Sequence, residues 1–305
     1  MKNPASSVSR QAPTPGPARW QRALSLAGVC LLLAVVWEGV KGLGGDPWRI
    51  TVSTPMPIHV QFTPPFSLAF ASDLNMPHLW VIAAAFVQPA QRYGPPLSTI
   101  LLQAASYTAR AAAVGFALGA LLGLGLGTLF AHVALLEQGL MPYVVASQTV
   151  PIVAIAPMIV VWWQAGWWSV ALIAAYLAFF PVTINTLRGL RSPDPCALEL
   201  LQSYAASRWT TLWKLRLPVA LPAIFTALKI AATASVVGAI IGELPSGIRD
   251  GLGGAILNFN QYYIAGPAKL WATIVVAALT GGIFFLAIAL SEHVVLRQTQ
   301  RRVET

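Results

Sequence analysis

Charged residues are scarce in this chain of 305 residues. They make up 10% of it, whereas a soluble globular domain carries roughly 25%. Hydrophobic residues reach 56%, and the mean hydropathy is +0.67. A soluble globule of this length cannot bury so much apolar surface. The composition therefore excludes a soluble protein and predicts an integral membrane protein with lipid as its solvent.

Cysteine is also scarce, and the motifs of common enzyme classes are missing. Cys30 lies in an apolar run and Cys196 in a basic loop, so they provide neither a disulfide framework nor a metal-ligand cluster. The four histidines are scattered, and no nucleophile and base converge in the sequence. No glycine-rich loop ends in Gly-Lys-Ser or Gly-Lys-Thr, so the chain lacks the phosphate-binding motif of an ATPase. We therefore expect no enzyme activity and no metal or cofactor bound by this chain.

Acidic residues are outnumbered by basic ones, 10 to 19, which gives a net charge of +9. Nucleic-acid binding would need a solvated platform for these charges, and an apolar chain does not offer one. Most of the basic residues instead fall in three segments: Lys2, Arg10, Arg19 and Arg22; then Arg188, Arg191, Arg208, Lys214 and Arg216; then Arg297, Arg301 and Arg302. Basic residues concentrated in short loops are typical of the cytoplasmic side of a membrane protein.

Six stretches are long and apolar enough to cross a membrane, since a spanning helix needs about 20 mainly apolar residues. They are residues 23–40, 109–132, 142–163, 167–187, 220–243 and 270–291. If the N-terminus is cytoplasmic, six crossings return the C-terminus to the cytoplasm and place the 188–219 loop there too. The sequence thus predicts an all-α, multi-pass protein of the cell (inner) membrane with both termini cytoplasmic.

These spans divide the chain into five parts. We expect a disordered cytoplasmic tail, a first transmembrane anchor, an external proline-rich segment, a transmembrane domain and a basic cytoplasmic tail, at residues 1–22, 23–40, 41–94, 95–295 and 296–305. The first span has no small-x-small cleavage site after it, which favours an uncleaved anchor over a signal peptide.

Small residues, prolines and polar residues distinguish three of the spans. Gly115, Gly119, Gly123 and Gly127 repeat every four residues in the second span, which predicts a face for close helix packing. Pro142, Pro151 and Pro157 interrupt the third span and predict a kinked helix. The polar residues chosen as candidates for a translocation path are Gln148, Thr149, Gln164, Ser235 and Glu243.

Two interpretations of these polar residues remain open. Polar groups at membrane depth indicate a transport path, but hydrogen bonds between helices explain them equally well. For Glu243 the structural interpretation is favoured over a gate at the external mouth. For Lys229, snorkelling to the lipid head groups and pairing with a neighbour are both possible.

The basic loop has its own structure. Asp194 followed by Pro195 predicts an N-cap and first helical position, with a short helix to about Tyr204. Ser207 can cap a second helix, which we expect to end at Leu217–Pro218. A pair of helices between two spans predicts a docking site for a cytoplasmic partner.

This loop resembles the signature of the inner-membrane permeases of binding-protein-dependent ABC importers. That signature is Glu-Ala-Ala, three residues, Gly, nine residues, then Ile-x-Leu-Pro. Here the spacing is intact, with alanine at the glycine position, leucine at the isoleucine position and two leucines in place of the two alanines. The resemblance implies that the loop couples to an ATPase through Glu199, Leu200, Leu201, Ala205, Ser207, Arg208, Leu215, Leu217 and Pro218.

The likeness covers about residues 95–295. Residues 151–157 and 162–166 are similar to the third-span pattern of the nitrate, sulfonate and taurine permease branch, and Gln164 stands where that branch often has glycine. The resemblance implies a type I permease fold of about six helices, a second permease copy (identical or different), ATPase subunits that use ATP in the cytoplasm, and an external solute-binding protein. The implied solute is nitrate-, sulfonate- or taurine-like, or a riboflavin- or thiamine-precursor-like vitamin.

The alternative is a secondary transporter or channel that is not coupled to ATP. A secondary transporter would couple through carboxylates inside the membrane or through broken helices in related repeats. Glu38 and Glu243 lie near span ends, and the loop signature occurs once.

The predicted topology can be tested by thiol labelling. A single cysteine at Ser192, in a cysteine-free background, should not react with an impermeant thiol reagent added outside intact cells. A cysteine at Ser72 should react. Labelling of position 192 from outside would overturn the six-span topology.

Overall fold

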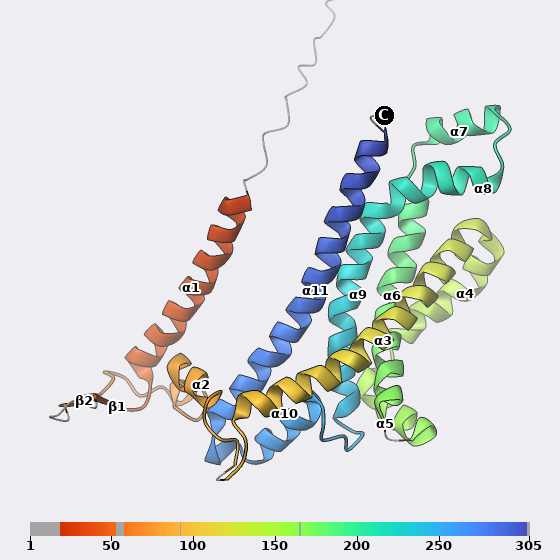
Figure 1. The fold of residues 1–305 in the computed structure, drawn as a ribbon. Helices are drawn as coiled ribbons and strands as arrows, with labels where there is room; N and C mark the ends of the chain where they lie inside the picture. The colour runs from red at the N-terminus through yellow and green to blue at the C-terminus, as the bar shows by residue number, and fades with distance from the viewer. Residues whose placement is uncertain (1–18, 53–57, 92, 165, 304–305) are drawn as a thin grey trace, which may run out of the picture. The chain divides into compact units, whose positions relative to one another are not determined.

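Residues 19–52, 58–91, 93–164 and 166–303 are described by the computed structural model shown in Figure 1. The chain divides into an N-terminal unit, residues 1–80, and a main unit, residues 81–305. Most of the predicted disordered tail, residues 1–18, lies outside the described residues. Residues 19–22 were predicted to belong to that tail, but they form the start of the first helix.

The N-terminal unit contains one long helix and a hairpin. Helix α1 (Arg19–Gly44) includes the first predicted span. Strands β1 (Trp48–Val52) and β2 (Ile58–Phe62) pair antiparallel, with Trp48 opposite Phe62. These strands were not expected, because the sequence predicted an all-α protein. Pro47 lies directly before β1, where it removes no ladder hydrogen bond.

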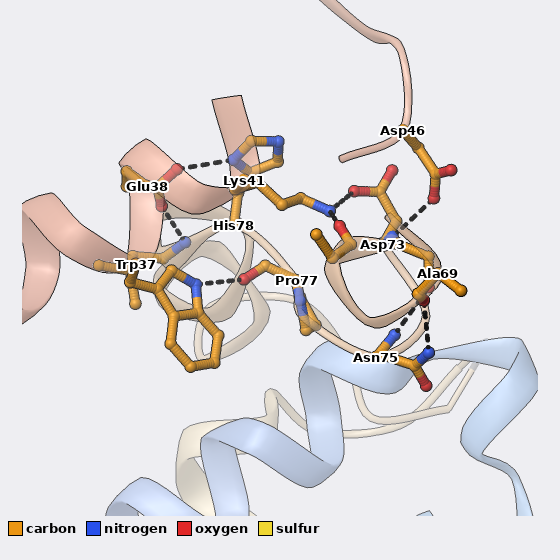
Figure 2. A network of polar contacts seen from close by, with 12 residues as sticks. Trp37, Glu38, Lys41, Asp46, Ala69, Asp73, Asn75, Pro77 and His78 are labelled. Carbon is orange, nitrogen blue, oxygen red and sulfur yellow. Dashed lines mark hydrogen bonds and ion pairs between the residues drawn. The ribbon is translucent and has the colours of Figure 1, made fainter. Parts of the chain in front are cut away.

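Three side chains at the end of α1 organise the segment that follows (Figure 2). The side chain of Lys41 is fully buried, and its ammonium donates to the carbonyl of Ala71 at 3.0 Å and pairs with Asp73. Glu38 accepts the backbone N–H of Leu79 at 2.7 Å and contacts the ring of His78 at 2.8 Å. The indole of Trp37 donates to the carbonyl of Pro77. A buried charge is tolerated only when it is paired in this way.

The regular elements of the main unit, among its described residues, are helices joined by short loops. Its larger elements are α2 (Leu79–Ala85, which starts in the N-terminal unit), α3 (Leu97–His132), α4 (Ala134–Ser147), α5 (Ile152–Trp163), α6 (Trp167–Leu190), α7 (Pro195–Ser203), α8 (Arg208–Thr211), α9 (Leu217–Glu243), α10 (Leu252–Gln261) and α11 (Pro267–Val303). Helix α11 continues through most of the predicted basic tail, residues 296–305.

Among the described residues, five helical segments are long and apolar enough to span a membrane. The predicted third span is not one helix. It is the pair α4 and α5, which are bent by 97° relative to each other and make a sixth span if they cross together. The break falls at Gln148–Pro151, because proline in a helix interior removes a backbone hydrogen bond and clashes with the preceding turn. The sequence predicted a kink here, and the structure shows a complete break between two helices.

Helices α3 and α6 touch through their backbones. The four regularly spaced glycines of α3 all face α6. A methyl group added at Gly119 would lie 2.7 Å from the Ala175 carbonyl oxygen, and one at Gly123 would lie 2.6 Å from the carbonyl oxygen of Phe179. Since real Cβ atoms do not approach this closely, only glycine fits at these positions.

Helix α6 is packed in the same way against α9. A methyl group on Gly238 of α9 would lie 2.9 Å from the Cα of Ala174, whose own Cβ faces Gly115 of α3. Ala171, Ala174 and Ala178 of α6 have no solvent exposure. Small residues on both sides of α6 therefore produce one close-packed core, α3–α6–α9, as small-residue faces do between membrane helices.

Two ion pairs join other elements of the main unit. Arg191, just after α6, binds Glu137 of α4 with both guanidinium branches, one of them at 2.7 Å. Lys229 of α9 donates to Glu292 of α11 at 2.8 Å, and both side chains are about one-fifth exposed. Of the two interpretations left open for Lys229, the structure shows pairing.

The core packing predicts a contrast between two glycines of α3. Gly123→Leu should prevent the approach of α6 and reduce the yield and thermal stability of the purified protein, because overpacking a close contact costs about 1–3 kcal/mol or more. Gly125→Leu is the matched control, since nothing lies within 4 Å of the Cβ that it would add. Equal thermal midpoints for the two variants, measured in the same detergent, would contradict the packing.

Candidate functional site

The loop between α6 and α9 begins with a capped helix. Asp194 precedes α7, and its carboxylate accepts the backbone N–H of Cys196 at 2.9 Å, while Pro195 occupies the first helical position. A proline there loses nothing, because the first backbone N–H groups of a helix have no partner within it. This N-cap was predicted from the sequence and is confirmed.

Helix α7 ends in a left-handed turn at Ala205, whose φ is +50°. The N–H of Ala206 donates to the carbonyl of Leu201 at 3.0 Å, and the N–H of Ala205 donates to Gln202 at 2.8 Å. This pair of bonds is the Schellman arrangement, which glycine normally completes. Alanine thus keeps the turn that glycine makes in the family signature, at a conformational cost of roughly 1 kcal/mol.

The second loop helix leads without a break into α9. Ser207 caps α8 by accepting the N–H of Thr210 at 3.2 Å, as predicted. The predicted end at Leu217–Pro218 was wrong. A π-helical turn, η2 (Leu212–Arg216), follows α8, and the N–H of Leu217 donates to the Leu212 carbonyl. This wider turn brings Pro218 into the first turn of α9, where it needs no hydrogen bond.

The loop is anchored at one residue and carries several exposed side chains. Leu212 is buried in a cluster with Leu190 of α6 and with Ala220 and Ile224 of α9. The carboxylate of Glu199 is exposed, and so are large apolar side chains of the loop, which include Leu200, Tyr204, Trp209 and Trp213. Solvent-exposed aromatic side chains gathered with charged residues are typical of a protein interaction surface. Figure 1 shows α7 and α8 at one end of the main unit.

The other end of α9 finishes at a buried carboxylate. Glu243 has no solvent exposure. One of its oxygens accepts the hydroxyl of Thr108 on α3 at 2.8 Å, and the other accepts the N–H of Gly253 in α10 at 2.7 Å. The Thr108 hydroxyl oxygen in turn accepts the N–H of Leu252 at 2.9 Å. These two side chains satisfy backbone donors in the first turn of α10, where negative charge is favourable.

Glycines make room for this junction of α3, α9 and α10, which we call the α10 junction. A methyl group on Gly253 would lie 2.7 Å from the Cβ of Glu243, and one on Gly251 would overlap the Glu243 carboxyl group. Glu243 was singled out from the sequence, but Thr108, Gly251 and Gly253 were missed. Three glycines within four residues, shortly after an acidic residue in an apolar chain, are the signal that could have indicated the two glycines. Thr108 has no such local signal.

The residues chosen as candidates for a translocation path do not meet. Gln148 and Thr149 lie exposed at the break between α4 and α5, whereas Ser235 is buried and bonds to Ala232 of its own helix. Gln164 ends α5 with a φ of +64°. That conformation explains why glycine often occupies this position in the family that the sequence resembles. Among the described residues, no hydrogen bond or ion pair joins any two of the five candidates.

Comparison of the sequence with known proteins identifies the protein family of this chain. Residues 115–304 match the model of the family described as binding-protein-dependent transport system inner membrane component. This match covers more than half of the chain, so the chain belongs to that family of type I ABC importer permeases.

Several curated relatives are similar over different lengths. The formylaminopyrimidine transport permease of Halalkalibacterium halodurans is 30% identical over 87% of this chain and 92% of its own length. The putative aliphatic sulfonates permease of Bacillus subtilis is 28% identical over 93% of this chain and 90% of its own length. The riboflavin transport system permease of Chloroflexus aurantiacus is 36% identical over 55% of this chain, and the match spans 61% of that protein.

The α10 junction predicts a large effect at Glu243 and a small one at Asp250. Glu243→Ala leaves the hydroxyl of Thr108 and the N–H of Gly253 without a partner, which should cost about 2–5 kcal/mol. Asp250 is exposed and accepts no hydrogen bond from the described residues, so Asp250→Ala should change stability by less than about 0.5 kcal/mol. Thermal unfolding of the purified variants measures both. Similar midpoints would refute the structural role of Glu243.

Proposed function

We propose that this chain is the translocation subunit of an ATP-driven importer. Two permease copies, this chain with itself or with a related one, form the path. ATPase subunits bind the α7–α8 loop, and an external binding protein delivers the solute. The observation that carries this proposal is the loop: two capped helices, anchored through Leu212, that carry an exposed Glu199 and exposed aromatic side chains.

The charge distribution supports the orientation of the chain. The end of the main unit that carries α7 and α8 also carries Arg188, Arg191, Arg208, Lys214 and Arg216. Basic loops face the cytoplasm, so the coupling loop lies where an ATPase can reach it and α10 lies outside. With six spans, both termini are cytoplasmic.

Energy has to come from a partner, because the chain has no nucleotide-binding motif. A secondary transporter would use a carboxylate that can exchange protons or ions within the membrane. In the described residues, each carboxylate of the candidate spans forms a hydrogen bond or ion pair within the protein instead. Glu243 is held at the α10 junction, Glu292 by Lys229, Glu137 by Arg191 and Glu38 by His78 and Leu79. This favours coupling to ATP over the alternative.

The solute belongs to the range that the relatives' names indicate. Those names are of permeases for riboflavin, formylaminopyrimidine and aliphatic sulfonates. We therefore place the imported compound among small polar organic molecules that a binding protein can enclose.

Charge reversal at Glu199 tests the coupling role. Glu199→Arg should insert and accumulate like the wild type but lose transport, because a like-charge contact at a tight interface costs roughly 2–5 kcal/mol. ATP hydrolysis in reconstituted vesicles should fall and become independent of the binding protein.

The matched variant Glu199→Gln removes the charge without reversing it and should keep part of both activities. Normal coupled transport by correctly inserted Glu199→Arg protein would remove the proposed role of this residue. If no ATPase co-purifies with the wild-type chain, the proposed function itself is wrong.

A further inference from the structure

A polar cavity of about 660 Å³ lies beside the α10 junction, at the opposite end of α9 from the coupling loop. Its walls are the first half of α3, the segment 247–250 and helix α10. This volume is within the range of sites for small organic ligands, about 300–1,000 Å³. It is larger than a single inorganic oxyanion needs.

The cavity holds two arginines that have no partner among the described residues. Arg110 of α3 and Arg249 of the 247–250 segment both line it, together with Asp250. Neither guanidinium takes part in any of the four ion pairs of the described chain. By contrast, Lys269, close to the same end, donates to the carbonyl of Ala90 at 2.8 Å.

The position of Arg110 makes its lack of a partner informative. It lies within the helix Leu97–His132, which qualifies as a membrane span. Ionisable residues on such helices are costly unless they pair or face a polar cavity, and they commonly mark a path for a solute or ion. The guanidinium groups at Arg110 and Arg249 give this cavity two planar sets of donors, which match carboxylate, sulfonate or phosphate oxygens.

The rest of the lining fits an organic ligand. Gln103 and Asn258 provide amide groups, and Tyr107 and Tyr262 provide aromatic surface with a polar end. The α3 side of the cavity is fixed in position. Thr108, the residue after Tyr107, donates its hydroxyl to Glu243 and accepts the N–H of Leu252. Counting the two arginines against Asp250, the charged lining carries a net positive charge that favours an anion.

We propose that this cavity receives the imported solute on the outer side of the membrane and binds a small organic oxyanion through Arg110 and Arg249. The inference rests on the proposed import function, and it narrows the solute to one that carries a sulfonate, carboxylate or phosphate group. Asp250 and the two amides are available for a second polar group on the same molecule, such as an amine.

The test uses the full-length permease with its ATPase in phosphatidylcholine nanodiscs. Saturation-transfer NMR measures the binding of butane-1-sulfonate, with butan-1-ol as the uncharged control. The wild type should bind the sulfonate and not the alcohol. Arg110→Gln and Arg249→Gln should each weaken binding at least tenfold, and Arg110→Lys, which keeps the charge, should weaken it less than Arg110→Gln.

Arg297→Gln is the matched control, because Arg297 is also an exposed arginine and lies outside the residues that line the cavity. It should bind the sulfonate like the wild type. An absent wild-type signal, equal binding by the Arg110 and Arg249 variants, or equal loss in Arg297→Gln would overturn the assignment.

Two further outcomes separate the possible sources of failure. Lipid head groups also carry oxyanions, so the measurement is repeated in nanodiscs that contain phosphatidylglycerol. If these lipids abolish the wild-type signal, the arginines bind head groups and the solute assignment is wrong. If the ATPase stays bound and is stimulated by the binding protein while no sulfonate binds, the cavity assignment fails and the proposed function stands.

Discussion

Backbone contact between α3, α6 and α9 is the constraint on which the rest of the structure depends. Lipid tails are as apolar as leucine, so membrane helices gain little from hiding apolar side chains against each other. They are stabilised instead by close packing of their backbones. Small residues permit this packing here: Gly119 and Gly123 on α3, Ala174 on α6 and Gly238 on α9. Leucine at any of these positions would separate helices whose backbones now touch.

Helix α9 belongs to this core and connects two different parts of the protein, the α7–α8 loop at its start and the α10 junction at its end. Its first turn continues from the α7–α8 loop, which Leu212 anchors to the core. Its last residue, Glu243, holds the first turn of α10 and the Thr108 hydroxyl of α3. A movement of the loop would therefore reach α10 through a helix that cannot bend independently of α3 and α6. Rigid-body motion of this kind is a common way to couple distant sites.

Local chemistry made parts of this structure predictable from the sequence. Asp194 and Ser207 cap helices with their own side chains, and the four-residue glycine period places one face of α3 against a neighbour. What was missed depends on residues far apart in the chain. Glu243 and Thr108 are 135 residues apart, and no local pattern announces their contact. The continuation of the helix past Pro218 depends on one π-helical turn, which propensity does not indicate.

Distance measurements between two spin labels on one chain test the rigid core most directly. The labels go on cysteines at Ser203 of α7 and Asn260 of α10, both exposed, after replacement of Cys30 and Cys196 with serine. Diluting labelled chains with unlabelled ones confines the signal to a single permease within the reconstituted complex. The account predicts the same distance distribution with and without a non-hydrolysable ATP analogue, because α9 and the core move as one body. A shift of this distribution on nucleotide binding would show that the core itself deforms.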